Sequence, residues 1–203
     1  MVVENNEIAK KIFQDCQSFL GPNSPIFFIP EIETHPMSGL EKNSISLAER
    51  NDALSRVIEL NGKPSLVLLS AFSLAQKIPE KKYFYNTLLD LKVGQNLEIS
   101  KLINKLIKYG YKRTHTVESL GEFSVRGSLI DIFSAGQELP IRVDFYEDFI
   151  DDIRVFDPVT QRTVGRQNNL IIRAIDYQNI NNISDCLLYT SDAADDMQCV
   201  DLG

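Results

Sequence analysis

The chain has 203 residues, of which 43% are hydrophobic and 24% charged, and its formal net charge is −7. This composition is sufficient for a buried core and excludes a disordered chain, and no apolar run approaches the roughly 20 residues that a membrane helix requires. The negative charge argues against strong nonspecific binding to duplex DNA, because that affinity comes mainly from Lys and Arg beside phosphates.

The first 82 residues show the pattern of an α/β unit. Two stretches with helical periodicity alternate with two short runs that are apolar on both sides, as buried parallel strands are, at residues 8–20, 26–29, 46–60 and 66–69. A capping-box sequence, Ser46-Leu-Ala-Glu49, is expected to open the second helix. Strand, helix, strand at this spacing predicts a parallel sheet with right-handed crossovers.

The pattern changes near Tyr83, where we place the start of a second unit that runs to residue 157. Apolar residues spaced by 3, 4, 7 and 8 predict a helix from Ile99 to Ile107. Runs that are apolar or alternate in polarity then predict antiparallel strands over 123–125, 129–133, 141–146 and 149–156. The second unit is therefore predicted to be an α+β unit with one helix or two and a β-meander.

Residues 158–185 are predicted to return to the first unit, with the apolar run 170–175 rejoining its sheet. Residues 186–203 have a different character, since they contain no Lys or Arg and no sustained period. Their first ten residues, CLLYTSDAAD, match the translation of one strand of a transposase-type sequencing-library adapter. We interpret 186–203 as an assembly artefact and the chain as a fragment whose natural part ends near residue 185; a natural surface tail is the alternative.

The three cysteines, Cys16, Cys186 and Cys199, form no CxxC pair and have no His at metal-ligand spacing. They are expected to be reduced thiols. The first residues lack the basic start and apolar stretch of a signal peptide. These features predict a cytoplasmic protein with no membrane segment.

Motifs for nucleotide binding and nucleophilic catalysis are missing from the sequence. The one Gly-Lys pair, Gly62-Lys63, is followed by Pro64, which removes an amide donor, and Val57 stands where a P-loop requires Gly. His35 and His115 are expected to be structural or solvated, and no GxSxG occurs. We therefore expect no catalytic residue and no bound cofactor in this chain.

An acidic cluster over 144–152, with Asp144, Glu147, Asp148, Asp151 and Asp152, could bind Mg²⁺ for phosphoryl chemistry. A turn at Glu147-Asp148 and the wet faces of the flanking strands explain the same residues without a metal. A Mg²⁺-dependent nuclease is kept as an alternative. A second charge pattern, with six basic residues and two acids over 101–126 but two basic residues and eight acids over 127–157, is typical of a contact selected by electrostatic complementarity.

Two segments are distinctive: GEFSVRGSLIDIF at 121–133, and PIRVDFYEDFIDDIRVFD at 140–157 followed by Thr160-Gln-Arg162. Together they resemble the damage-recognition module shared by the excinuclease protein UvrB and the transcription-repair coupling factor family. The match covers residues 10–175. The wording of 154–162 and the proline-flanked stretch FIPEIETHP at 28–36 are closer to the coupling factors. An N-terminal piece of UvrB, which binds ATP and DNA, is the alternative.

The resemblance implies a degenerate, helicase-like α/β domain, present here in part, with an inserted UvrB interaction domain. In this family the inserted domain recruits the excinuclease protein UvrA in transcription-coupled nucleotide excision repair. The parent protein recognises stalled RNA polymerase and uses a separate ATP-driven and Mg²⁺-dependent motor on double-stranded DNA. The motor and polymerase-binding domains are not expected in these residues.

The resemblance also implies which residues contact the partner. The Tyr-x-Arg of the family matches Arg113, and the arginine of its GEF-x-x-RG stretch matches Arg126; Phe123 is a further candidate contact, with core packing as its alternative. UvrB has another arginine where Ser124 stands here. Gly121 and Gly127 are expected to serve backbone turns, Gly127 as a bulge. Arg suits such a contact because its planar fork pairs bidentately with carboxylates.

Overall fold

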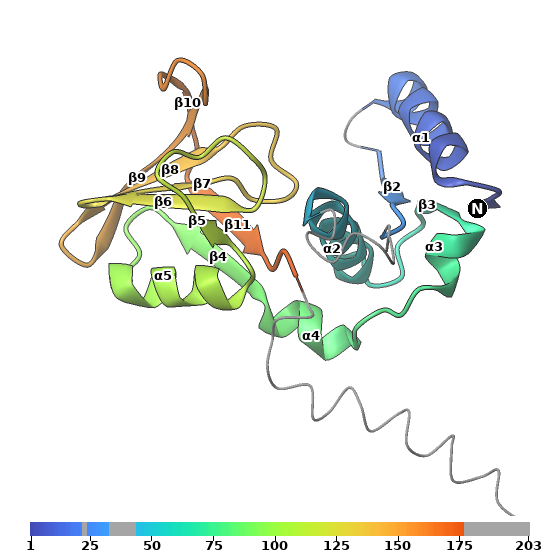
Figure 1. Ribbon diagram of the computed structural model, residues 1–203, viewed down its shortest axis with the longest axis horizontal. Helices are drawn as coiled ribbons and strands as arrows, with labels where there is room; N and C mark the ends of the chain where they lie inside the picture. The colour runs from blue at the N-terminus through green and yellow to red at the C-terminus, as the bar shows by residue number, and fades with distance from the viewer. Residues whose placement is uncertain (22–23, 33–43, 177–203) are drawn as a thin grey trace, which may run out of the picture.

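The computed structural model describes residues 1–21, 24–32 and 44–176, which form two lobes joined by a short helix, α4 (Lys81–Asn86). The first lobe contains β1 to β3 and the helices α1 to α3; the second contains β4 to β11 and α5 (Figure 1). The architecture is mixed α/β, with one parallel and two largely antiparallel sheets. None of the helices in the described ranges has the length and hydropathy needed to cross a bilayer.

The first lobe is a small parallel sheet with helices packed around it. Its strands are β1 (Val2–Val3), β2 (Ile26–Ile29) and β3 (Leu66–Ser70), in the order β1-β3-β2. Its helices are α1 (Asn6–Leu20), α2 (Ser44–Glu59) and α3 (Ala71–Ala75). Successive residues of a strand face opposite sides, so Phe28 packs on Phe13 of α1 while Ile29 joins the α2 side of the sheet. The expected strands and helices are confirmed.

The ends of α1 follow from its sequence. The Asn5 side chain accepts a hydrogen bond from the Ile8 amide at 2.9 Å, which satisfies one unpaired donor at the helix start. Gly21 ends the helix with φ of 84°. The capping box predicted at Ser46 is wrong, because α2 begins two residues earlier and Ser46 lies within its first turn.

The second lobe is a six-stranded sheet with a helix and a two-stranded ribbon packed on one face. The sheet order is β10-β9-β8-β7-β6-β5, with β5 parallel to β6 and all other neighbours antiparallel. Its strands are β5 (Lys112–Arg113), β6 (Glu122–Arg126), β7 (Leu129–Ile132), β8 (Ile141–Tyr146), β9 (Phe149–Phe156) and β10 (Thr163–Arg166). The predicted meander and the predicted helix, α5 (Ile99–Lys108), are confirmed.

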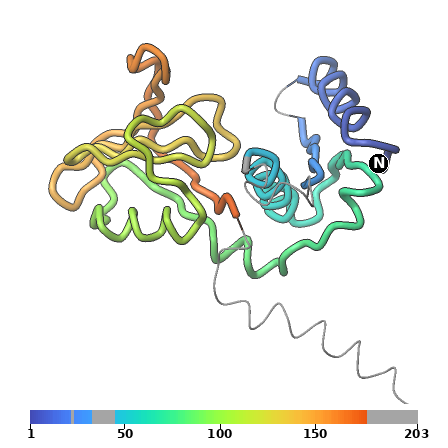
Figure 2. Tube along the Cα trace, in the orientation of Figure 1, coloured from blue at the N-terminus to red at the C-terminus, as the bar shows by residue number. Residues whose placement is uncertain are grey.

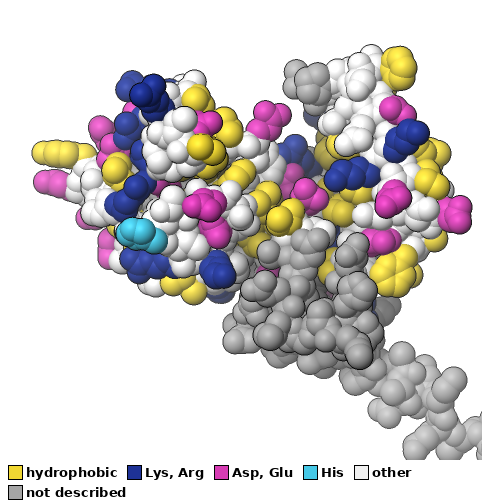
Figure 3. Space-filling view, turned by 45° about the horizontal axis from the view of Figure 1, so that its top comes forward, with side chains coloured by type: hydrophobic (Ala, Val, Ile, Leu, Met, Phe, Trp, Pro, Cys, Tyr) yellow, Lys and Arg dark blue, Asp and Glu magenta, His cyan; other side chains and the backbone are white. Residues whose placement is uncertain are grey.

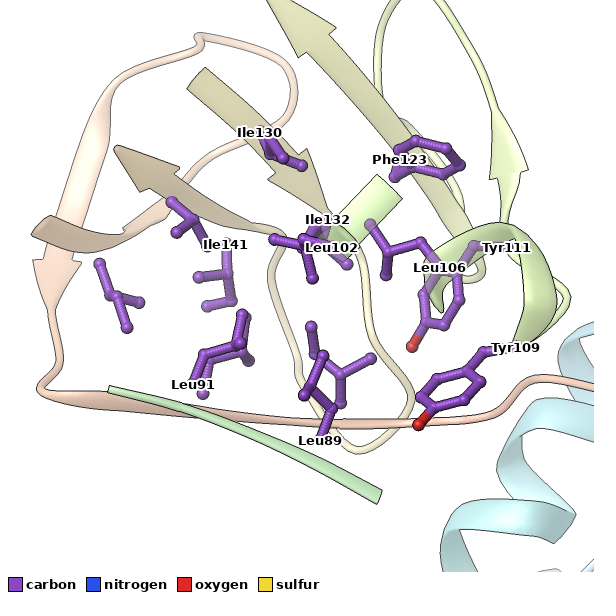
Figure 4. Packing of buried hydrophobic residues seen from close by; sticks show 14 of the residues in the cluster. Leu89, Leu91, Leu102, Leu106, Tyr109, Tyr111, Phe123, Ile130, Ile132 and Ile141 are labelled. Carbon is purple, nitrogen blue, oxygen red and sulfur yellow. The ribbon is translucent and has the colours of Figure 1, made fainter. Parts of the chain in front are cut away.

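The core of the second lobe lies between that sheet and α5. Leu102 and Leu106 of α5 are fully buried and meet Ile130, Ile132 and Ile141 from the strands (Figure 4). The strict alternation of β8, with Ile141, Val143 and Phe145 inward, gives one sealed face and one polar face. Burial of this apolar face fixes the sheet that carries Arg113 and Arg126.

The predicted return of residues 170–175 to the first sheet is wrong. These residues lie in and just after β11 (Asn169–Arg173), which pairs antiparallel with β4 (Leu88–Lys92) in the second lobe. Leu170 and Ile172 are fully buried against the core of that lobe. An apolar run indicates a buried strand, but it does not indicate the sheet that the strand joins.

The two lobes meet where α2 passes the end of β11 (Figure 2). Arg173 contacts Asp52 at 3.2 Å and donates two hydrogen bonds to Glu59, at 2.9 and 3.0 Å. The Asn51 side chain, almost fully buried, donates to the carbonyls of Ala174 and Ile175. We call Asn51, Asp52, Glu59 and Arg173 the interlobe network.

Candidate docking surface

The six-stranded sheet has one apolar face and one charged face. The pairing places Ser124, Asp131, Arg142, Arg154 and Arg166 in one row across five strands. Side chains of paired residues share a face, so this row lies opposite the core. A neighbouring row holds Arg126, Leu129, Asp144 and Asp152. These two rows define the outer face.

Arg126 lies on the outer face with its side chain 44% exposed, and it forms an ion pair with Asp131. Its guanidinium is therefore held at one point while the side chain stays partly exposed. Contact of this residue with a partner stays a prediction.

Arg113 is exposed on β5, at the free edge of the sheet. This short strand is held by two amide hydrogen bonds of 2.8 Å, from Lys112 to Gly121 and from Thr114 to Phe123. The pairing matches Arg113 with Phe123, three residues before Arg126, which is roughly 10 Å along β6. Paired side chains share a face, so Arg113 leaves the exposed edge on the side of Phe123, whereas Arg126 lies on the outer face of the neighbouring strand.

Basic side chains follow one another along the visible side of the second lobe (Figure 3). The candidate docking surface is defined here as the edge and outer face around Arg113 and Arg126. Because the two side chains leave the sheet on different faces, a partner would contact both guanidinium groups by wrapping around the β5 edge, and an acidic partner would be attracted to them.

Phe123 is not part of this surface. Its side chain is fully buried in the cluster that contains Tyr111 and Ile132 (Figure 4). The candidate contact role is therefore corrected, and the alternative given for Phe123, core packing, holds. It supports β5 and β6 from within.

Both candidate turn glycines adopt a conformation that side chains disfavour. Gly121 has φ of 87°; its amide donates to the Phe133 carbonyl and its carbonyl accepts from Lys112, both at 2.8 Å. Gly127 has φ of 63° in the turn between β6 and β7. The predicted bulge at Gly127 is wrong, because the pairing continues from Arg126 with Leu129 without a shift.

The acidic cluster is divided between ion pairs and a turn. Asp144 accepts a hydrogen bond from Arg154 at 2.8 Å, and Asp152 lies 3.4 Å from the same side chain. Glu147 has φ of 53° in the turn between β8 and β9, where the sequence predicts one. Within the described ranges, no three acidic, His or Cys side chains converge as metal ligands do.

Other candidates of the sequence contribute no group to the surface. Cys16 is a free, partly exposed thiol in the first lobe. Gly62 has φ of 85° and lies with Lys63 in the turn that follows α2. His35 and the segment 186–203, with its two cysteines, lie outside the described residues.

Sequence reasoning missed one residue that shapes the surface, Asp131. Its side chain is only 2% exposed, and it binds both Arg126 and Arg142. The signal was present, since Asp131 is the one charged residue in an otherwise apolar strand. A buried carboxylate requires a cationic partner, and that requirement points to neighbouring arginines.

Comparison with known proteins identifies the second lobe. The UvrB interaction domain family matches residues 89–176. Transcription-repair-coupling factors are similar over most of the chain. That of Myxococcus xanthus is 32% identical over 168 residues, which are 80% of this chain and 14% of the relative. That of Haemophilus influenzae is 34% identical over 145 residues, 71% of this chain and 12% of the relative. That of Bacillus subtilis is 27% identical over 187 residues, 85% of this chain and 15% of the relative.

The chain thus spans about a seventh of the length of the curated relatives that it matches. The matched residues 89–176 include α5, the meander, β4 and β11, which together form the second lobe. Residues 89–176 belong to the UvrB interaction domain family, and the chain is related through most of its length to the transcription-repair-coupling factors.

Proposed function

We propose that this chain is a non-catalytic docking module that binds the excinuclease protein UvrA through the candidate docking surface. The observation that carries the proposal is the placement of Arg113 and Arg126 on the rigid sheet of a UvrB interaction domain, with both guanidinium groups exposed. A sheet with a sealed core holds such groups in place, which lowers the entropy lost on binding.

We also propose that the whole protein acts in transcription-coupled repair, where it brings UvrA to a stalled RNA polymerase on double-stranded DNA. The transcription-repair-coupling factors among the relatives support this role. In this proposal the first lobe is part of a helicase-like domain that has lost its own nucleotide site. The turn at Gly62-Lys63, which lacks the features of a phosphate-binding loop, supports that view.

The test is binding of the full chain to purified UvrA without ATP, measured by isothermal titration calorimetry. Reversal of both charges, Arg113→Glu with Arg126→Glu, is expected to weaken binding at least about tenfold, because each new carboxylate would face an acidic partner. Affinity that survives this double substitution contradicts the proposed surface.

The matched control is Lys105→Glu with Lys108→Glu. It makes the same change in net charge at two exposed positions of α5, which packs on the face of the sheet opposite to Arg126. It should leave the affinity within about twofold, since the remaining effect is long-range and screened by salt. Equal weakening by both double variants would indicate an effect of net charge without a defined surface.

A further inference from the structure

Asp131 is a buried carboxylate shared by two arginines. Its side chain is 2% exposed. Arg142 approaches it with two N–H groups, Nε to Oδ1 at 2.6 Å and Nη2 to Oδ2 at 2.9 Å, and Arg126 donates from Nη2 to Oδ2. The two cations are not equivalent, since the side chain of Arg142 is 13% exposed and that of Arg126 is 44% exposed.

Several contacts hold the Arg142 side chain in place. Its guanidinium lies 4.5 Å from the ring centre of the buried Phe156 and also donates to Gln161 at 3.0 Å. Its hydrogen bonds to Asp131 raise the pKa of the guanidinium still further. This paired fork is the geometry in which Arg and a carboxylate bind most strongly. Arg142 alone therefore compensates the charge of Asp131.

The three side chains together carry one net positive charge, and the exposed member is Arg126. A carboxylate paired with Arg126 alone would cancel its charge. Here the more buried Arg142 supplies the compensating charge, so Arg126 keeps its attraction for an anionic group. Asp131 meanwhile holds one end of that flexible side chain, and a side chain already fixed loses less entropy on binding.

We propose that Asp131 and Arg142 are positioning residues that hold Arg126 in the orientation in which it meets an acidic group of the partner. This inference rests on the proposed docking function and deepens it. It assigns no direct contact with the partner to Asp131 or Arg142; both act through Arg126.

Replacement of the aspartate separates positioning from net charge. Asp131→Asn makes the surface more positive, so attraction by charge alone would strengthen binding to an acidic partner. A positioning role predicts that Asp131→Asn weakens binding instead. The loss of one immobilised Arg side chain should weaken binding between about twofold and tenfold.

The experiment is a double-mutant cycle on the full chain with UvrA as the probe. Asp131→Asn is measured with Arg126 present and with Arg126→Gln, and the unfolding transition of each variant is recorded. We expect Asp131→Asn to weaken binding only where Arg126 is present. A merely structural role would weaken binding equally in both backgrounds.

A second variant keeps the test open if Asp131→Asn alone fails to fold, since it leaves Arg142 without its carboxylate. Asp131→Asn with Arg142→Gln removes both buried charges together and should show the same dependence on Arg126. NMR relaxation of the Arg126 Nε–H group should then show greater mobility than in the parent chain. Asp144→Asn is the control on the same face, because its partner is Arg154, and its effect should not depend on Arg126.

The outcomes separate the two proposals. If Arg126→Gln weakens binding but Asp131→Asn strengthens it, or weakens it equally in both backgrounds, the positioning role is overturned and the docking function stands. If Arg126→Gln leaves the affinity unchanged, the docking surface itself is overturned, and the positioning role with it.

Discussion

The two lobes differ in the size of the apolar cluster that each buries. The second lobe closes around one large cluster that includes both sheets and α5. Among the described residues, the first lobe together with Phe84 of α4 buries a smaller cluster: Ile29, Ala53, Leu54, Leu69 and Phe84. Large apolar side chains remain exposed in both lobes, among them Phe19 at 88% in the first and Val159 at 88% in the second. The family match covers the lobe with the closed core.

This difference indicates what each lobe needs in order to be stable. Stability comes mainly from apolar area removed from water, and the second lobe buries a large apolar cluster. The first lobe depends more on its contact with the second, and the interlobe network provides that contact. The candidate docking surface is thus carried by the lobe with the larger buried cluster.

The largest effect is expected from the core of the second lobe. Phe123→Ala should lower the free energy of unfolding by about 3–5 kcal/mol, because Phe123 is fully buried and its truncation leaves a cavity. Phe19→Ala, at an exposed position of the first lobe, is the control and should change it by less than about 0.5 kcal/mol. Urea unfolding followed by circular dichroism measures both. A loss below about 1 kcal/mol for Phe123→Ala would mean that the second lobe does not carry the stability.

A smaller effect is expected at the contact between the lobes. Arg173→Met should cost about 2–3 kcal/mol, at or below the usual range for one partner of a buried ion pair, because Asp52 keeps a second partner in Arg56 at 2.8 Å. The loss should appear first in the first lobe. Amide hydrogen exchange should therefore rise in α2 before it rises in β7 and β8.

The control for this change is Lys92→Met, which removes an exposed ion pair with Asp90 of 3.0 Å. Exposed pairs contribute about 0–1 kcal/mol, so exchange should stay as it was in both lobes. Equal acceleration of exchange in α2 and in β8 after Arg173→Met would show that the lobes unfold as one unit, and the contrast drawn above would be lost.

Both lobes were predictable from their sequences only in part. The helix at 99–107 and the alternation at Ile141, Val143 and Phe145 were predictable, because one sealed face imposes a period on the chain. The partner of β11 was not, because an apolar run such as 170–175 carries no information about which sheet it joins. The two-residue strand β1 was missed because it is too short to show a period.

The candidate site, too, was predictable from the sequence only in part. Arg113 and Arg126 are exposed, as charged residues usually are, and their contact with a partner stays a prediction. The link between Arg126 and Arg142 could not be predicted, because it depends on the pairing of β6, β7 and β8 around Asp131. Long-range pairing decides such contacts, and no local pattern reports it.

Two carboxylates with opposite pKa shifts give the smallest and most local comparison. In the interlobe network, burial raises the pKa of Asp52 above its ordinary value, against the lowering effect of Arg56 and Arg173. In the second lobe, hydrogen bonds from the backbone and hydroxyl of Thr160 lower the pKa of Asp157. We expect ¹³C NMR titration to place the two carboxyl groups on either side of the ordinary value, about 3.9.

The pH dependence of stability should follow with opposite signs. The folded chain holds the Asp52 proton to higher pH than the unfolded chain does, so the contribution of this group falls as the pH rises from about 3.9 to its folded pKa. For Asp157 the contribution is present above about pH 3.9 and is lost as the pH falls through its folded pKa. Asp52→Asn should therefore remove a decline in the free energy of unfolding above about pH 3.9. Asp157→Asn should remove a rise in the same quantity as the pH increases toward about 3.9. Urea unfolding at a series of pH values measures both slopes. An Asp52 carboxyl that titrates below the ordinary value would show that its arginine partners outweigh burial, and the contact between the lobes would then strengthen with pH.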